Sequence, residues 1–266
     1  MTYHNLEIET KGGVATVWLN RPQVRNALDE VFIAEISRAF ANLQLDESVR
    51  VVVLAGRGTA FCAGGDIKWM KRMAGFSAYQ NLQDAMLLAQ MLKTVHSCPK
   101  PVIGRVHGPA FAGGMGLAAA CDIIVADRAA EFCLTEVRIG LVPATISPYV
   151  IQALGVQASR RYMLTAERLP AEQALLLGFV QELCDVGEID VAVSRIAAAL
   201  LNAGPRALSQ TKALIEQVVA NPLDAELMRN TAQHIANVRA SDEGREGVTA
   251  FLEKRKPNWL TAKGDH

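Results

Sequence analysis

The stretches Ala-Phe-Cys-Ala-Gly-Gly-Asp-Ile (residues 60–67) and Gly-Pro-Ala-Phe-Ala-Gly-Gly-Met-Gly-Leu (residues 108–117) carry most of the information about the fold. Each follows a strand candidate, at 51–54 and 102–107, and the first of these is a wholly apolar run of the kind found in strands that are covered on both faces. Each also leads into residues that can form a helix. The sequence therefore predicts two places where a glycine-rich turn joins the end of a strand to the start of a helix.

Such turns can place backbone groups next to a ligand for catalysis, or they can serve only for tight packing. Glycine lets a ligand approach the backbone closely, and the first turn of a helix has unpaired N–H groups and a dipole that favours negative charge. Two such N–H groups aimed at one point would form an oxyanion hole. Neither stretch has the spacing of a nucleotide-phosphate loop or of a dinucleotide fingerprint. Taken singly, each turn is also compatible with tight packing alone.

The rest of the first two thirds alternates between strand and helix. Residues 14–19 and 123–126 read as strands. Asp29 is placed to cap a helix that continues to about Leu43, because its apolar residues recur every three or four positions. A second long helix is predicted over 77–95, with Ser77 as its cap.

The pattern changes near residue 186 and is almost wholly helical from there to about residue 256. We therefore expect two regions. Residues 1–195 would form a strand–helix core that binds the substrate, and residues 196–266 a helical region for oligomerisation.

Charge and composition exclude several classes of protein. The 266 residues contain 27 basic and 27 acidic side chains, which argues against a nucleic-acid partner. No apolar run is long enough to span a membrane, and the N-terminus lacks the order of a signal peptide. The expected location is the cytoplasm.

Cysteine and histidine residues give no sign of a metal site. The five cysteines are irregularly spaced without a C-x-x-C pair, so we expect free thiols, with Cys62 and Cys133 as small buried residues. The histidines lack metal-ligand spacing. His107 is expected to bond to backbone at the end of a strand rather than to act as a base.

Several segments, in their order along the chain, closely resemble the crotonase family of enoyl-CoA hydratases and isomerases. They are residues 20–28, 61–67, 108–123, 138–143, 164–168 and 251–257. The resemblance implies an α/β fold, a spiral of ββα units with a C-terminal helical trimerisation region. It also implies an acyl-CoA thioester as substrate and a homotrimer or a dimer of trimers. No separate cofactor is implied, because coenzyme A is part of the substrate.

The resemblance also assigns residues to the site. It places the two oxyanion N–H groups on Gly65 and Gly113. Contacts to CoA are implied for Val24, Arg25, Ala27, Ala63, Asp66, Ile67 and Lys254. Two of these have other readings: Asp66 could cap the following helix, and Lys254 could be a solvated helix end.

One carboxylate of the family pattern is present and the other is missing. Glu136 is the expected acid/base, and its apolar neighbours should raise its pKa by desolvation. The second glutamate of typical hydratases falls at Gly116, which has no side chain. With Glu136 alone, either hydration of a 2-enoyl-CoA or isomerisation between 3-enoyl and 2-enoyl forms is open, and hydration is our first choice.

The sequence from 136 to 168 looks like bacterial methylglutaconyl-CoA hydratases of leucine breakdown. Such a substrate has a distal carboxylate, so a cation should face the acyl pocket. Lys68, Arg72 and Arg138 are candidates, although a solvated helix face is the expected role for any one of them. The region from Met70 to Leu92 is expected to form one wall of the pocket. Two other classes stay open: decarboxylation of a malonyl-type thioester on the same scaffold, and a non-catalytic homologue that binds acyl-CoA or RNA.

Overall fold

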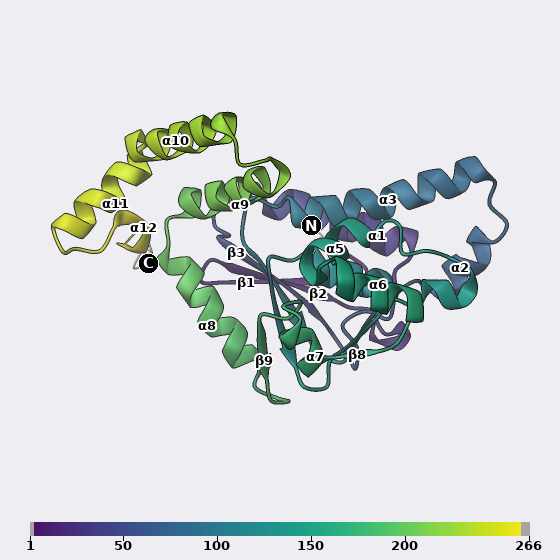
Figure 1. The fold of residues 1–266 in the computed structure, drawn as a ribbon. Coiled ribbons are helices and arrows are strands. Elements are labelled where there is room, and N and C mark those ends of the chain that lie inside the picture. Colours follow the sequence, from purple (N-terminus) through teal and green to yellow (C-terminus); the bar gives the residue numbers. More distant parts are fainter. Residues whose placement is uncertain (1–2, 262–266) are drawn as a thin grey trace. The chain divides into compact units, whose positions relative to one another are not determined.

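The structure is a computed structural model that describes residues 3–261, and it divides into two compact units (Figure 1). One unit comprises the chain up to residue 98 together with 102–195, and the other comprises 99–101 and the chain from 196 onward. Helix α8 (Ile189–Asn202) contains the division.

A six-stranded sheet forms the centre of the first unit. Its order is β1 (Leu6–Lys11), β2 (Val14–Leu19), β3 (Val51–Gly56), β4 (Val102–Val106), β6 (Ile123–Asp127) and β9 (Glu182–Cys184). β1 is antiparallel to β2, and all other neighbours are parallel. Every residue of β3 is buried, as its unbroken apolar run predicted.

The four strands expected from the sequence are confirmed, and two strands of this sheet were missed. β1 is an edge strand with charged residues on its solvent side, so it has no continuous apolar run. β9 has only three residues, which is too short for its periodicity to be read.

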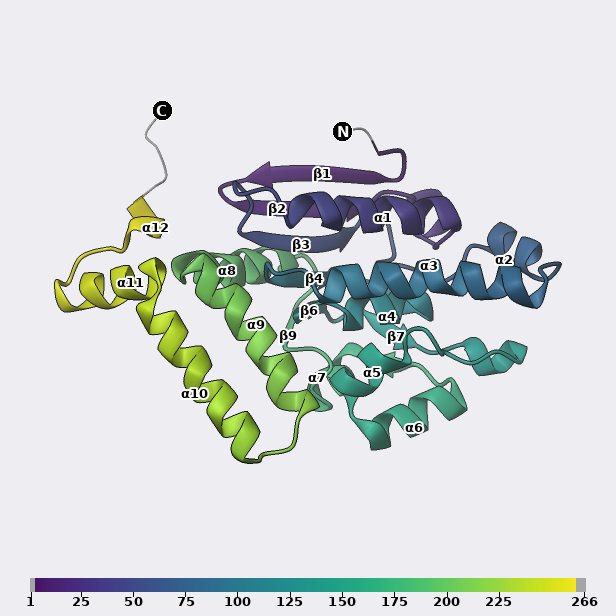
Figure 2. The ribbon, with the colours of Figure 1, turned by 90° about the horizontal axis from the view of Figure 1, so that it is seen from above.

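The long helices begin at the predicted caps. In α1 (Glu30–Leu43) the Asp29 side chain accepts a hydrogen bond from the Phe32 N–H, and α3 (Ala78–His96) begins with a capping box built on Ser77. The two helices pack against each other, and Figure 2 shows α1 beside strands β1, β2 and β3. The short α2 (Ile67–Met73) precedes α3.

A second, smaller sheet consists of β5 (Pro109–Phe111), β7 (Glu131–Cys133) and β8 (Leu169–Pro170). The sequence did not predict it, because strands of two or three residues leave no pattern. An isolated parallel bridge adds Cys62 beside Ala110, and another joins Leu28 to Gly65. These pairings bring both glycine-rich stretches into one layer.

The remaining elements of the first unit are mostly short helices. They are η1 (Pro22–Val24), α4 (Gly113–Ala119), η2 (Glu136–Ile139), α5 (Ser147–Leu154), α6 (Val156–Thr165) and α7 (Ala171–Leu176). Phe132 and Phe179 meet edge to face, 5.0 Å apart, within its core.

The second unit is helical, as predicted for this part of the sequence. It contains α9 (Pro205–Ala220), α10 (Ala225–Ala240), α11 (Asp242–Leu252) and α12 (Asn258–Thr261). The Glu243 carboxylate accepts hydrogen bonds from the backbone N–H groups of Arg206 and Ala207, which joins α11 to the start of α9. In the described residues, no helix has the length and apolarity needed to cross a membrane.

Candidate active site

The register of the small sheet brings three predicted residues to one place. Cys62, Ala110 and Phe132 are successive parallel partners across this layer. Gly65, Gly113 and Thr135 each lie three residues further along one of these three segments, so they reach the same edge of the layer. Glu136 follows Thr135 directly.

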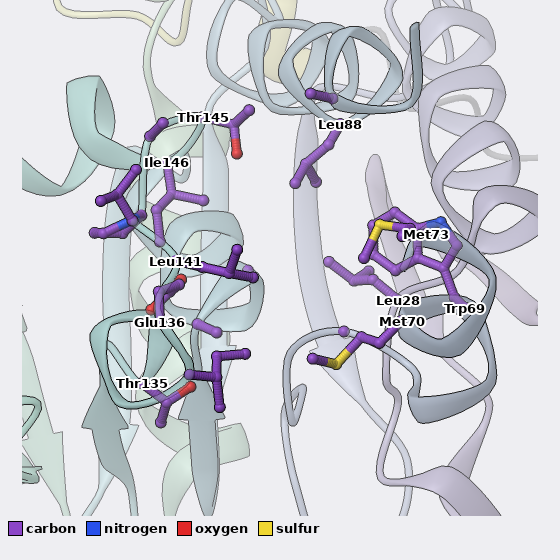
Figure 3. Close-up of a pocket in the computed structure, with 18 of the residues that line it drawn as sticks. Leu28, Trp69, Met70, Met73, Leu88, Thr135, Glu136, Leu141, Thr145 and Ile146 are labelled. Carbon is purple, nitrogen blue, oxygen red and sulfur yellow. The ribbon is translucent and has the colours of Figure 1, made fainter. Parts of the chain in front are cut away.

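Gly65, Gly113 and Glu136 all line one cavity of about 380 Å³ in the first unit. Figure 3 shows its two sides: Thr135, Glu136, Leu141, Thr145 and Ile146 face Leu28, Trp69, Met70, Met73 and Leu88. Most of the lining is apolar, and a few polar groups converge on it. This composition is typical of a small-molecule site.

The backbone of residue 28 orients Gly65. The Leu28 N–H donates to Gly64 O (2.7 Å), and Leu28 O accepts from the Asp66 N–H (2.8 Å). In such a parallel bridge the residue between the two bonded positions points its own N–H away from the partner. Gly65 therefore keeps a free N–H, which makes no hydrogen bond within the described chain.

Gly113 presents its N–H for a different reason. It is the first residue of α4, and the first N–H groups of a helix have no partner inside the helix. The preceding Ala112 has φ 47° and ψ −120°, a strained conformation for a residue with a side chain, and its N–H donates to Cys133 O (2.7 Å). The strain is thus held by a bond to the segment that leads into Glu136.

Glu136 begins the short η2 turn, and its carboxyl is half-buried. Its Oε2 atom is buried and has no hydrogen-bond partner among the described residues. Burial raises the pKa of the Glu136 carboxyl above its ordinary value, as the sequence predicted. Arg138 donates to Ala166 O (2.5 Å), which attaches the turn to the end of α6. A buried, unpaired carboxyl oxygen on a fixed turn is suited to proton transfer.

The position of the missing second glutamate is filled. A Cβ atom on Gly116 would stand 2.2 Å from Ile146 Cγ2 and 2.5 Å from Ile146 Cβ. Ile146 is buried and lines the cavity. An apolar side chain thus occupies the direction in which a side chain at 116 would extend.

A polar network supports the loop that carries Gly65. The buried Asn26 side chain accepts from the Arg21 N–H and donates to Arg57 O and Ala60 O, all at 2.8–2.9 Å. Arg21 also pairs with Asp29 and Asp66. Burial alone would raise the pKa of Asp66, but a hydrogen bond from the Lys68 N–H and the charge of Arg21 lower it overall.

The expected CoA contacts occupy varied positions. Ala63 lines the cavity, and Asp66 is the N-cap of α2, which confirms the capping prediction. Ala27 is buried, whereas Val24, Arg25 and Ile67 are exposed, Ile67 by 71%. Lys254 belongs to the second unit and has a left-handed backbone. Their contacts with CoA stay predictions.

The expectation of a cation facing the acyl pocket was wrong, whereas the alternative of a solvated helix face is confirmed for Lys68 and Arg72, which are exposed on α2. In the described residues no Lys or Arg lines the cavity. Arg72 pairs with Glu30 (2.7 Å), Arg138 binds Ala166 O, and Lys68 does not reach the lining.

The predictions of a buried Cys62 and of a His107 that bonds to backbone are confirmed. Cys62 is buried, and its burial raises the pKa of the thiol to about 12. The His107 Nε2 atom lies 2.9 Å from Gly58 O. Within residues 3–261, no group of three or more potential ligands could hold a metal ion.

The expected wall from Met70 to Leu92 is confirmed, but the sequence did not show which of its side chains face the cavity, and Trp69 lies just outside that range. Trp69, Met73, Asp84 and Leu88 line this wall, from α2 and α3. The four-residue spacings 69–73 and 84–88 place each pair on one helix face, but neither spacing identifies what that face covers.

Replacing Asn26 with alanine should destabilise the protein by about 2–4 kcal/mol, because one N–H and two carbonyl groups lose their buried partner. Urea unfolding would measure this. Asn81→Ala, at an exposed position, is the control and should change stability by less than about 0.5 kcal/mol. Equal effects of the two substitutions would contradict the role given to Asn26.

Gly116→Ala should cost about 1–3 kcal/mol through its clash with Ile146. Ile146→Gly removes the opposing atoms, so the double variant should be more stable than the sum of the two single changes predicts. Gly75→Ala, where a new Cβ meets nothing closer than 3.6 Å, is the matched control. Strict additivity in a double-mutant cycle would disprove the contact.

Comparison with known proteins agrees with this geometry. The model of the family described as enoyl-CoA hydratase/isomerase matches residues 9–262. A crystal structure of an enoyl-CoA hydratase from Shewanella pealeana has a TM-score of 0.94 at 40% identity, covering 96% of each chain. One from Mycobacterium smegmatis has a TM-score of 0.91 at 33% identity, over 97% of this chain and all of the other.

A crotonyl-CoA hydratase of Syntrophomonas wolfei is 30% identical over 98% of this chain and 100% of its own length. The six-stranded sheet with its small second layer is thus the α/β crotonase fold, and the protein is an enzyme of the enoyl-CoA hydratase type. The chain belongs to the enoyl-CoA hydratase/isomerase family.

Proposed function

We propose that this enzyme adds water across the double bond of a 2-enoyl-CoA to give a 3-hydroxyacyl-CoA. The observation that carries the proposal is the shared cavity of Gly65, Gly113 and Glu136, in which two free backbone N–H groups accompany one buried, unpaired carboxyl oxygen. The family relationship supports the same reaction.

The Gly65 and Gly113 N–H groups bind the thioester oxygen. When the water oxygen bonds to C3, the π electrons of the double bond move through C2 to the thioester oxygen, and an enolate forms. Two fixed N–H donors stabilise that negative charge without any rearrangement of solvent, and one such donor is typically worth about 100- to 1000-fold in rate.

Glu136 performs both proton transfers. Its carboxylate takes one proton from the attacking water and then delivers a proton to C2 as the enolate collapses. The sum is one water added and no net change in the enzyme. Because residue 116 is a glycine and Ile146 occupies the space beside it, no carboxylate at that position shares this work.

Isomerisation of a 3-enoyl-CoA is the second candidate. It requires the same enolate and a single carboxylate that moves a proton between C4 and C2. Because Ile146 fills the space beside Gly116, no carboxylate at that position can hold a water molecule, and this favours isomerisation, which needs no water.

The finer proposal for the acyl group, 3-methylglutaconyl-CoA, depends on the sequence resemblance around Glu136. The lining supplies hydroxyl groups, on Thr135 and Thr145, but no Lys or Arg within the described residues to pair with the distal carboxylate. This thioester therefore forms one arm of the assay.

We also propose that the enzyme is a homotrimer or a dimer of trimers. Large apolar side chains of the second unit, among them Leu223, Phe251 and Leu252, are more than 70% exposed. Burial against another subunit would remove this surface from water.

The test is a pair of assays on the purified enzyme. One follows crotonyl-, 2-hexenoyl- and 3-methylglutaconyl-CoA for loss of conjugated-enoyl absorbance, with the 3-hydroxyacyl product confirmed by mass. The other follows a 3-enoyl-CoA for a rise in that absorbance. Hydration in the first assay supports the proposal, whereas activity in the second assay alone would make the enzyme an isomerase.

Glu136→Gln should lower kcat by about 100- to 10,000-fold while acyl-CoA binding stays intact, since the amide keeps the shape but cannot accept the proton. Calorimetric titration with a saturated acyl-CoA measures the binding. A variant that retains more than a tenth of the activity would refute the role of Glu136.

The pH dependence follows from the raised pKa of Glu136. The base is the carboxylate, so kcat/KM should fall on the acid side at a pH above the ordinary glutamate value of about 4.3. Folding favours the protonated form of Glu136, and this stabilises the folded protein. The stabilisation is fully present below the ordinary glutamate pKa and is lost as pH rises through the raised pKa of the folded protein. Glu136→Gln should lack this trend, and identical pH–stability curves for both proteins would contradict it.

A further inference from the structure

Trp69 lies on the cavity wall opposite Glu136 (Figure 3). It is only 6% exposed and is the one buried residue of α2. Its ring atom Cζ3 lies 3.6 Å from the point where a Cβ on Gly65 would stand, and Met70 Sδ is equally near. The indole ring therefore packs beside the glycine that is proposed to hold the thioester oxygen.

A hydrogen bond fixes the orientation of this ring. Trp69 Nε1 donates to Asp84 Oδ1 at 2.9 Å, which links α2 to α3. An indole N–H that is withdrawn from water needs an acceptor, and an ionised acceptor makes the bond stronger than a neutral one. Asp84 also lines the cavity, so this bond forms part of the wall itself.

The other apolar side chains of this wall adapt more easily. Met70 and Met73 are unbranched and can change rotamer around a ligand. Trp69 is rigid, and turning it aside would break its bond to Asp84. The cavity, at about 380 Å³, lies near the lower end of the usual range of about 300–1,000 Å³ for small-molecule sites.

We propose that Trp69, held by Asp84, forms a rigid side wall of the acyl cavity opposite Glu136 and, by restricting the space in this cavity, limits the substrates to short-chain 2-enoyl-CoA thioesters. Trp69 is the specificity-determining residue, and Asp84 is a positioning residue that acts through it. The inference rests on the proposed hydratase function, because the chain-length limit applies to the acyl group that the oxyanion hole and Glu136 would process.

The test measures kcat/KM for crotonyl-, 2-hexenoyl-, 2-octenoyl- and 2-decenoyl-CoA. For the unmodified enzyme, the value should fall at least tenfold between 2-hexenoyl- and 2-decenoyl-CoA. Trp69→Ala should reduce this ratio at least tenfold by enlarging the cavity. Trp69→Leu, a smaller truncation, should shift it in the same direction and guards against a folding failure of the alanine variant.

Asp84 is tested by rescue. Asp84→Ala removes the acceptor and should relax the chain-length ratio, whereas Asp84→Asn keeps an acceptor oxygen and should preserve it. Trp69→Phe lacks the N–H donor, so adding Asp84→Ala to it should change the ratio no further. Glu47→Gln, an exposed substitution with the same change in charge, is the control and should leave activity and ratio unchanged.

An unmodified enzyme that hydrates 2-decenoyl-CoA as efficiently as crotonyl-CoA would overturn the proposal, as would equal effects of Asp84→Ala and Asp84→Asn. If no thioester is hydrated, the proposed function fails, and the cavity limit is then tested by binding alone. Calorimetric titration with butyryl- and decanoyl-CoA should still show at least tenfold weaker binding of the longer chain, which Trp69→Ala reduces. Equal affinities would refute the limit.

Discussion

The parallel pairing of Leu28 with residues 64–66 is the constraint on which the site depends. It commits the carbonyl group of Gly64 and the N–H of Asp66 to Leu28, and it leaves the N–H of Gly65, which lines the cavity, without a partner in the described chain. The pairing holds only while residues 21–28 stay in an unusual path, with Arg25 and Asn26 both at positive φ. The side chain of Asn26, bonded on three sides and fully buried, supplies the stabilisation that this path requires.

The same layer explains why residues far apart in the sequence share one site. Cys62, Ala110 and Phe132 stand in register, so equal numbers of residues beyond them lead to the same edge. The strained Ala112 is bonded to Cys133, and this bond links the second glycine turn to the strand that carries Glu136. Backbone geometry, rather than side-chain contacts, thus sets the relative positions of the two donors and the base.

The sequence predicted the elements whose patterns are local. The buried strand at 51–54 and the helices capped by Asp29 and Ser77 follow from periodicity and capping chemistry. The small sheet could not be predicted, because its strands are too short and its order is set by tertiary pairing. For the same reason the candidate site was identified by resemblance at Gly65, Gly113 and Glu136. The region from Met70 to Leu92 was expected to form one wall, but the contacts between its side chains were not predicted. Trp69 and Asp84 meet only because two helices pack, and nothing in either segment indicates the other.

The contact between Gly116 and Ile146 bears on what a single carboxylate must do. With two carboxylates, one can hold the water while the other exchanges a proton with carbon, and each can keep one protonation state between steps. With an isoleucine in that space, the proposed hydration would require Glu136 to alternate between both states within each turnover. A carboxyl whose pKa is raised by burial is suited to this alternation, because the raised pKa lowers the free-energy cost of holding the proton between the two transfers. Burial of Glu136 and the apolar side chain of Ile146 are therefore linked. Ile146 fills the space that a carboxylate at position 116 would need, and it lines the same cavity as Glu136.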